Sequence, residues 1–274
     1  MHDWDDAFNN MGHVKDSDAL PGFWAARASA YREGPARVEV DLPYGDHDRE
    51  KFDLIWPGMA PKGLIVFVHG GFWMRLDKSY WTDLAEGARA NGWVVCIPSY
   101  TLTPDIRVSG ITQQVAAAIE AAGRLVDGPI RLAGHSAGGH LVTRMLCLDS
   151  PLSAETLARV EKTITISGLH DLRPLLHTAM NDTLKLTEKE AVAESPALMR
   201  TSGPANVVVW VGGNERPEFI RQSRLLAVMW EGLDAHIKFK IDAGHNHFTI
   251  LEGLKMPSSE ICSALTKQDL AAAI

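Results

Sequence analysis

Apolar runs with no polar interruption recur along this chain, and they limit its fold more than any other feature. Leu64–Val68 and Val207–Val211 contain apolar residues only. A strand that has one face in water alternates polar and apolar residues, whereas a strand covered on both faces is apolar throughout. Such runs are typical of a parallel sheet between two layers of helices.

Strand-like and helix-like segments alternate over most of the chain. The predicted strands are Arg37–Tyr44, Lys51–Trp56, Gly63–His69, Trp93–Ser99, Ile130–Gly134, Lys162–Ser167, Asn206–Val211 and Ala235–Ile241. The predicted helices between them are Ser79–Ala90, Ser109–Val126, Ala137–Leu148 and Glu215–Glu231. The alternation predicts an α/β fold: a mostly parallel eight-stranded sheet with helices on both faces, whose first two strands form an antiparallel pair. Active-site loops of such sheets lie at the carboxyl ends of the strands.

No repeat or linker divides the 274 residues, so residues 1–274 are predicted to form a single domain, with residues 1–36 as an N-terminal helical entry segment. The formal charge of −7, from 27 basic and 34 acidic residues, argues against a nucleic-acid partner. The three cysteines lack metal-ligand spacing, and the chain starts without a secretory pattern. No run is long enough for a membrane span. We therefore expect a cytoplasmic protein without a membrane partner.

A candidate nucleophile lies where a strand is predicted to meet a helix. In Gly134-His135-Ser136-Ala137-Gly138, glycines stand two residues before and two after the serine. A nucleophile elbow needs this spacing because the serine occupies a strained turn against which other backbones pack. The start of the following helix would direct free amides toward an oxyanion beside the hydroxyl. The alternative is an ordinary turn in which Ser136 caps the helix.

A candidate oxyanion loop follows the strand Gly63–His69. His69-Gly70-Gly71-Phe72-Trp73 places two glycines where the chain can turn its amides toward a substrate. We expect oxyanion donors among Gly70, Gly71 and Phe72, together with the amide of Ala137. His69 is expected to orient the loop by hydrogen bonds.

A serine hydroxyl needs an imidazole base, and the imidazole needs a carboxylate to fix its tautomer. In α/β sheets that carry a nucleophile elbow the three follow the chain order Ser, acid, His. His247 is the preferred base because Phe248 and the following residues suggest a helix that anchors it; His245 is the alternative. Glu215, just after the penultimate strand, is the preferred acid over Asp171 and Asp242.

These segments together resemble the α/β-hydrolase superfamily, in the branch that includes the kynurenine formamidases. The resemblance rests on Ala7-Phe8-Asn9-Asn10, Asp41–Gly45, the H-G-G-F-W loop, the elbow, Ser167–Leu172, Gly212–Phe219 with Arg221-Gln222-Ser223, and His247-Phe248. Many members carry Asp where this chain has Glu215. The resemblance implies a triad of Ser136, Glu215 and His247 that removes a formyl group from an aromatic amine, N-formylkynurenine giving kynurenine and formate. It also implies that no metal or other cofactor takes part.

The expected partner is a small acyl substrate. Trp73, Tyr100 and Leu169, with Phe72 and Trp81, are predicted to line an aromatic pocket, although large residues of this kind also form cores. Some of the aromatic residues could instead pack against a second copy in a homodimer. The rival functions are a general carboxylesterase and a non-catalytic ligand-binding relative. A thiol enzyme has no local support, because Cys96 lies within a predicted strand and Cys147 late in a predicted helix.

Overall fold

The computed structural model describes residues 3–233 and 235–268, and its eight strands form one sheet. The strands are β1 (Arg37–Pro43), β2 (Lys51–Trp56), β3 (Leu64–Val68), β4 (Val94–Pro98), β5 (Ile130–His135), β6 (Val160–Ile166), β7 (Ala205–Gly212) and β8 (Ala235–Asp242). Their order across the sheet is β1-β2-β4-β3-β5-β6-β7-β8. β2 is antiparallel to both β1 and β4, and every other neighbouring pair is parallel. The predicted fold class is confirmed.

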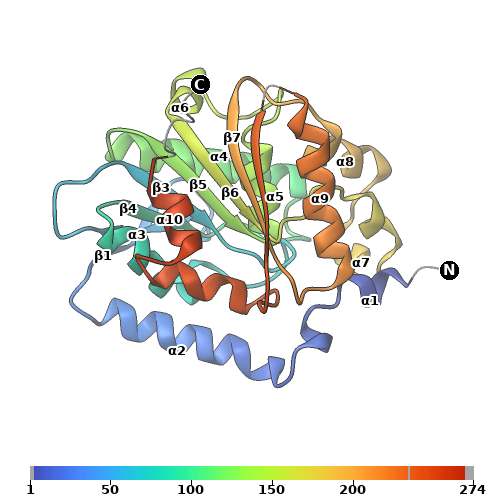
Figure 1. Cartoon of the computed structure of the whole chain (residues 1–274), viewed down its shortest axis with the longest axis horizontal. Helices are drawn as coiled ribbons and strands as arrows, with labels where there is room; N and C mark the ends of the chain where they lie inside the picture. The colour runs from blue at the N-terminus through green and yellow to red at the C-terminus, as the bar shows by residue number, and fades with distance from the viewer. Residues whose placement is uncertain (1–2, 234, 269–274) are drawn as a thin grey trace.

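Helices cover both faces of the sheet (Figure 1). The α-helices are α1 (Trp4–Phe8), α2 (Leu20–Arg32), α3 (Glu86–Ala90), α4 (Val108–Leu125), α5 (Ala137–Arg144), α6 (Ala154–Ala158), α7 (Asn181–Leu184), α8 (Glu188–Ala193), α9 (Pro217–Glu231) and α10 (Glu260–Thr266). The 3₁₀ helices are η1 (Met11–His13), η2 (Ser17–Ala19), η3 (Lys78–Tyr80), η4 (Thr82–Ala85), η5 (Arg173–His177), η6 (Pro196–Leu198) and η7 (Thr249–Lys255).

Strand β3 contributes side chains to two hydrophobic cores, one on each face of the sheet. In β3, Leu64, Val66 and Val68 pack in the core that contains residues of α4 and α5. Ile65 and Phe67 point to the opposite face and pack with residues of η4, α3, η7 and α10. Because successive side chains of a strand point to opposite faces, the unbroken apolar run is what allows both layers to cover β3.

Two predicted helices differ from the structure. The segment predicted as one helix, Ser79–Ala90, consists of η3, η4 and only one α-helical stretch, α3. Trp81 interrupts it with φ −127° and ψ 5°, outside the helical region. The predicted helix Ala137–Leu148 ends at Arg144, and Cys147 instead forms a β-bridge with Thr201.

The N-terminal segment carries helices α1 and α2, which lie at different places on the sheet domain (Figure 1). α2 packs through Trp24, whose ring lies 5.0 Å from Trp81 and 5.5 Å from Phe248. α1 lies beside α9, where Phe8 contacts Phe219 edge to face at 6.0 Å. The segment therefore reaches the carboxyl-end loops of the sheet at two points.

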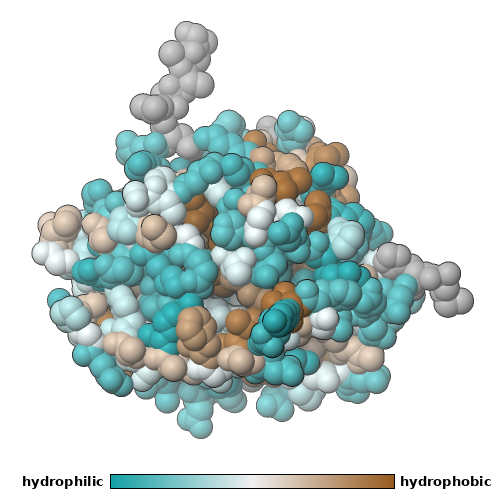
Figure 2. Space-filling view, turned by 60° about the horizontal axis from the view of Figure 1, so that its bottom comes forward, coloured by the Kyte–Doolittle hydropathy of each residue, from teal (hydrophilic) through white to brown (hydrophobic). Residues whose placement is uncertain are grey.

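The molecular face turned forward in Figure 2 is mostly hydrophilic, with hydrophobic residues gathered in smaller patches. Within residues 3–233 and 235–268, none of the helices has the length and apolar character that crossing a membrane requires.

Candidate active site

Ser136 occupies a strained turn between β5 and α5. Its φ of 56° and ψ of −118° are unusual for a residue with a side chain. The turn packs tightly against the end of β3: a Cβ atom on Gly138 would lie 1.9 Å from the carbonyl oxygen of Val68. Only glycine fits there, and this contact holds the serine in its strained conformation at the edge of a pocket.

The loop after β3 lies directly against this turn. A Cβ atom on Gly70 would lie 2.9 Å from the Cβ atom of Ser136. Gly71, Phe72 and Trp73 all have positive φ, which turns the backbone sharply. Within the described residues, the backbone N–H groups of Gly70, Gly71, Phe72 and Ala137 donate no hydrogen bond. Four unused donors thus lie beside or immediately after Ser136.

His247 and Glu215 form a buried hydrogen-bonded pair. His247 Nδ1 lies 2.7 Å from Glu215 Oε2, and the residues are 4% and 8% exposed. Glu215 Oε1 accepts hydrogen bonds from the Ser167 hydroxyl at 2.5 Å and from the Gly212 amide at 2.8 Å. An ionised carboxylate can only accept hydrogen bonds, so a charged Glu215 accepts all three of these bonds, and His247 then donates its bond through Nδ1–H. His247 and Ser136 line the same pocket.

His135 contacts both the backbone and the ring of His247, a contact that the sequence did not predict. Its Nε2 lies 2.8 Å from the carbonyl oxygen of His247, and the two rings are 4.5 Å apart. Burial lowers the pKa of His135 well below its ordinary value, so the neutral ring donates this bond through Nε2–H. Ser167 was also missed as a partner of Glu215; its position directly after β6 was the available signal.

The competing acids and base lie elsewhere. Asp171 pairs with Arg173 at 2.9 and 3.0 Å; burial raises the pKa of Asp171, but the hydrogen bonds from Arg173 outweigh burial and lower it. Asp242 accepts a hydrogen bond from the indole of Trp210 at 3.0 Å. His245 does not line the pocket that contains Ser136. The structure therefore brings together Ser136, Glu215 and His247 and leaves the alternatives outside.

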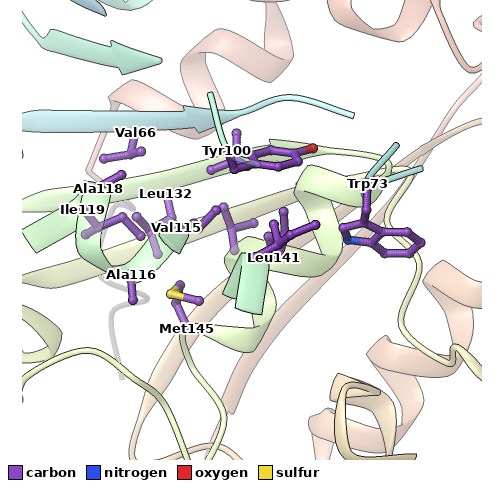
Figure 3. Packing of buried hydrophobic residues seen from close by; sticks show 14 of the residues in the cluster. Val66, Trp73, Tyr100, Val115, Ala116, Ala118, Ile119, Leu132, Leu141 and Met145 are labelled. Carbon is purple, nitrogen blue, oxygen red and sulfur yellow. The ribbon is translucent and has the colours of Figure 1, made fainter. Parts of the chain in front are cut away.

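Trp73, Tyr100 and Leu169 do not line the pocket, contrary to expectation. All three are 0% exposed and belong to the same hydrophobic core, in which Figure 3 shows Trp73 and Tyr100. Tyr100 stacks on His69 at 4.4 Å, and His69 Nδ1 donates to the Gly70 carbonyl oxygen at 2.7 Å. These aromatic residues hold the loop in place from behind, because its sharp turn points Trp73 inward while Phe72 faces the pocket.

Trp73 is anchored by a second buried histidine. Its indole N–H donates to His140 Nδ1 at 3.2 Å, and His140 Nε2 donates to the Glu194 carbonyl oxygen at 2.7 Å. Burial lowers the pKa of His140 to about 3, so this histidine stays neutral and structural.

The cysteines are inert by the same reasoning. All three are buried and free, and burial raises the pKa of Cys96 and brings that of Cys147 to about 11. A thiol that is not ionised is a poor nucleophile.

Among the described residues, no group of three or more His, Cys, Asp or Glu side chains could hold a metal ion.

A cavity of about 450 Å³ opens beside Ser136. It is enclosed by the loop after β3, the turn at Ser136, the segment around His247 and the N-terminal segment. Its aromatic lining comes from Phe8, Trp24, Phe72, Trp81 and Phe248. Its size and lining suit a small organic molecule with a flat aromatic part.

Comparison with known proteins fits this geometry. A profile of the α/β hydrolase fold matches residues 65–207, which is half of the chain. The kynurenine formamidase of Danio rerio is 30% identical over 246 residues, covering 84% of this chain and 83% of that protein. That of Salmo salar is 31% identical over 234 residues, covering 81% and 78%. The chain belongs to the α/β-hydrolase family, in its arylformamidase-like branch.

A solved structure resembles this hydrolase over nearly its whole length. The protein, from Silicibacter sp. TM1040, is described provisionally as a thioesterase; its TM-score is 0.92 at 44% identity, with 97% of this chain and 100% of that chain covered. The family profile and the kynurenine formamidase relatives confirm, at the level of the family, the resemblance noted from the motifs, and the protein is a hydrolase of that family.

Proposed function

We propose that this hydrolase cleaves the formyl group from an aromatic formamide, N-formylkynurenine giving kynurenine and formate, with Ser136, Glu215 and His247 as its catalytic triad. The observation that carries the proposal is the buried 2.7 Å bond between Glu215 and His247, formed at the cavity that Ser136 also lines. The aromatic lining of that cavity and the similarity to the kynurenine formamidases support the formamide as substrate.

The first half of the reaction forms a formyl-enzyme. His247 Nε2 takes the Ser136 proton as the oxygen attacks the formyl carbon, and Glu215 stabilises the imidazolium through Nδ1–H. The resulting oxyanion accepts hydrogen bonds from the unused amides near Gly71 and Ala137; one such donor is worth about 3 kcal/mol in the transition state. His247 then gives its proton to the nitrogen of the leaving amine as the C–N bond breaks.

The second half regenerates the enzyme. Water attacks the formyl ester while His247 takes its proton, and the same amides hold the second oxyanion. Collapse of this intermediate transfers the proton from His247 to Ser136 and releases formic acid, which loses its remaining acidic proton to water to give formate. The formyl group is the smallest acyl group, so it is the one least hindered by the close approach of Gly70 to Ser136.

Thioester hydrolysis is a second candidate, because the Silicibacter protein described as a thioesterase shares 44% of its residues with this chain. General ester hydrolysis would use the same residues. The experiment compares kcat/KM for N-formylkynurenine, short p-nitrophenyl esters and a short acyl-coenzyme A, with Ser136→Ala as the inactive control.

We expect the formamide to have the highest kcat/KM, and a fluorophosphonate probe to label the wild type but not Ser136→Ala. A preference for either ester class with no cleavage of the formamide would refute the proposed substrate. Folded wild type that the probe does not label would refute the serine mechanism.

A further inference from the structure

Exposed side chains of both charges line the mouth of the cavity. Asp3 and Asp5 lie on the N-terminal segment around α1, and Arg75 lies on the loop that follows β3; all three are exposed and line the cavity. Within the described residues, the Arg75 guanidinium makes no ion pair or hydrogen bond. Asp6 also lines the cavity, but it is already paired with Arg216. Two carboxylates and one guanidinium therefore remain available to a ligand.

α1 is held firmly enough to present these carboxylates at a fixed place. Asp5 Oδ1 accepts a hydrogen bond from the backbone amide of Ala179 at 2.7 Å, and Asp3 Oδ1 caps α1 by accepting from the Asp6 amide at 3.0 Å. Each of these two bonds uses one oxygen of its carboxylate. The second oxygen of each is left for an ammonium group.

Asn10 gives an independent sign that a ligand belongs here. The residue is only 5% exposed, lines the cavity, and its Nδ2 has no hydrogen-bond partner among the described residues. A buried donor without an acceptor is costly unless something else satisfies it. Asn10 also borders a smaller cavity of about 200 Å³ that Glu215 and His247 line, so a ligand oxygen bound to Asn10 would lie near that pair.

We propose that this cavity recognises a leaving group that carries an α-amino-acid head, with Asp3 and Asp5 binding its ammonium group and Arg75 its carboxylate. Asn10 donates to an oxygen of the same ligand. This inference rests on the proposed formamide hydrolysis and adds the residues that select its substrate. Because the available charge at the mouth is net negative and the chain as a whole carries −7, a leaving group with several phosphates, such as coenzyme A, is disfavoured.

The test uses four formanilides that share one leaving aromatic amine and differ only in the head of its side chain: zwitterionic, cationic, anionic or neutral. The variants are the double substitution Asp3→Asn with Asp5→Asn, and Arg75→Gln. Asparagine keeps the oxygen that caps α1 and the one that binds Ala179, so α1 stays in place. The matched control is Asp16→Asn with Asp18→Asn, which changes the net charge equally on an exposed part of the same segment that does not line the cavity.

We expect the Asp3 and Asp5 double variant to lower kcat/KM about tenfold for the cationic and zwitterionic substrates, since each exposed ion pair changes binding by roughly three- to fivefold. The loss should be in KM, should shrink in high salt, and should be absent for the neutral substrate and in the control variant. Arg75→Gln should cost roughly three- to fivefold for the zwitterionic and anionic substrates only.

Equal effects on charged and neutral substrates, or no effect on any, would overturn the assignment of these residues. Cleavage of the neutral formanilide separately reports the proposed function. If the wild type cleaves none of the four formanilides, formamide hydrolysis is refuted, and the same four heads on phenyl esters then decide whether the charge selection holds.

Discussion

Replacing Glu215 with glutamine tests the central hydrogen bond of the site with almost no change in shape. Glu215 Oε1 accepts from the Gly212 amide at 2.8 Å and from the Ser167 hydroxyl at 2.5 Å. The backbone amide of Gly212 can only donate, so the glutamine must place its oxygen at that side. Its NH₂ group then faces His247 Nδ1, where the carboxylate stood at 2.7 Å.

This fixed orientation determines the size of the effect. Facing an NH₂ donor, Nδ1 of His247 must accept, so the ring proton moves to Nε2, the nitrogen that has to take the proton of Ser136. In serine hydrolases the change from acid to amide lowers kcat by about 10⁴ for this reason. We expect a loss of about 10³–10⁴ in kcat here, which corresponds to about 4–5.5 kcal/mol.

The assay is kcat and KM with N-formylkynurenine and with a p-nitrophenyl ester, and unfolding in urea shows whether each variant is folded. Asp171→Asn is the matched control: Asp171 was the competing acid, and its bonds run to Arg173 instead of His247. It should keep kcat within a few fold. If Glu215→Gln stays within tenfold of the wild type while folded, or if Asp171→Asn carries the large loss, the assignment of the acid is wrong.

Two further predictions concern the stability of the fold. Gly138→Ala should lower the free energy of unfolding by more than about 3 kcal/mol, because the added Cβ would lie 1.9 Å from a carbonyl oxygen of β3. The control, Gly22→Ala, has open space around the added Cβ and should leave unfolding in urea nearly unchanged. Equal stability of the two variants would contradict the packing of the turn. Burial lowers the pKa of His69 to about 4 and of His140 and His170 to about 3. Between pH ~6.5 and ~4 the unfolded chain therefore binds more protons than the folded chain. The contribution of these histidines to the free energy of unfolding is fully present above pH ~6.5, and below it falls by up to about 1.4 kcal/mol per pH unit for each histidine. A urea midpoint that does not change between pH 7.5 and 5 would refute this.

The motifs that lie within one short segment were predictable because their conformation depends only on residues of that segment. The strand before Ser136, the glycine spacing and the helix after it are all local, and the structure forms the turn as expected. The helix predicted over Ser79–Ala90 was wrong for the opposite reason. There, η3, η4 and α3 follow the packing of Trp81 against Trp24 of α2, a contact between residues far apart in the chain.

The lining of the cavity was beyond the reach of sequence reasoning. Phe72 and Trp73 are neighbours of similar character, yet Phe72 lines the cavity and Trp73 is fully buried in the core behind it. Both residues have positive φ, which turns the backbone sharply there, and the indole of Trp73 is held in the core by its hydrogen bond to His140. The part played by Asp3, Asp5 and Asn10 was equally hidden, because nothing near them in the chain shows which loops α1 packs against.

The sequence by itself determined the α/β class, the order of the sheet-forming segments and the positions of Ser136, Glu215 and His247 along the chain, since apolar periodicity and short motifs are local properties. Only the tertiary structure placed Glu215, and not Asp171, against His247, brought His135 into contact with His247, and brought Arg75 to the cavity that α1 also lines. These choices depend on which loops meet at the carboxyl end of the sheet. The positions of these loops are fixed by packing between segments that are distant in sequence, and no local sequence pattern predicts that packing.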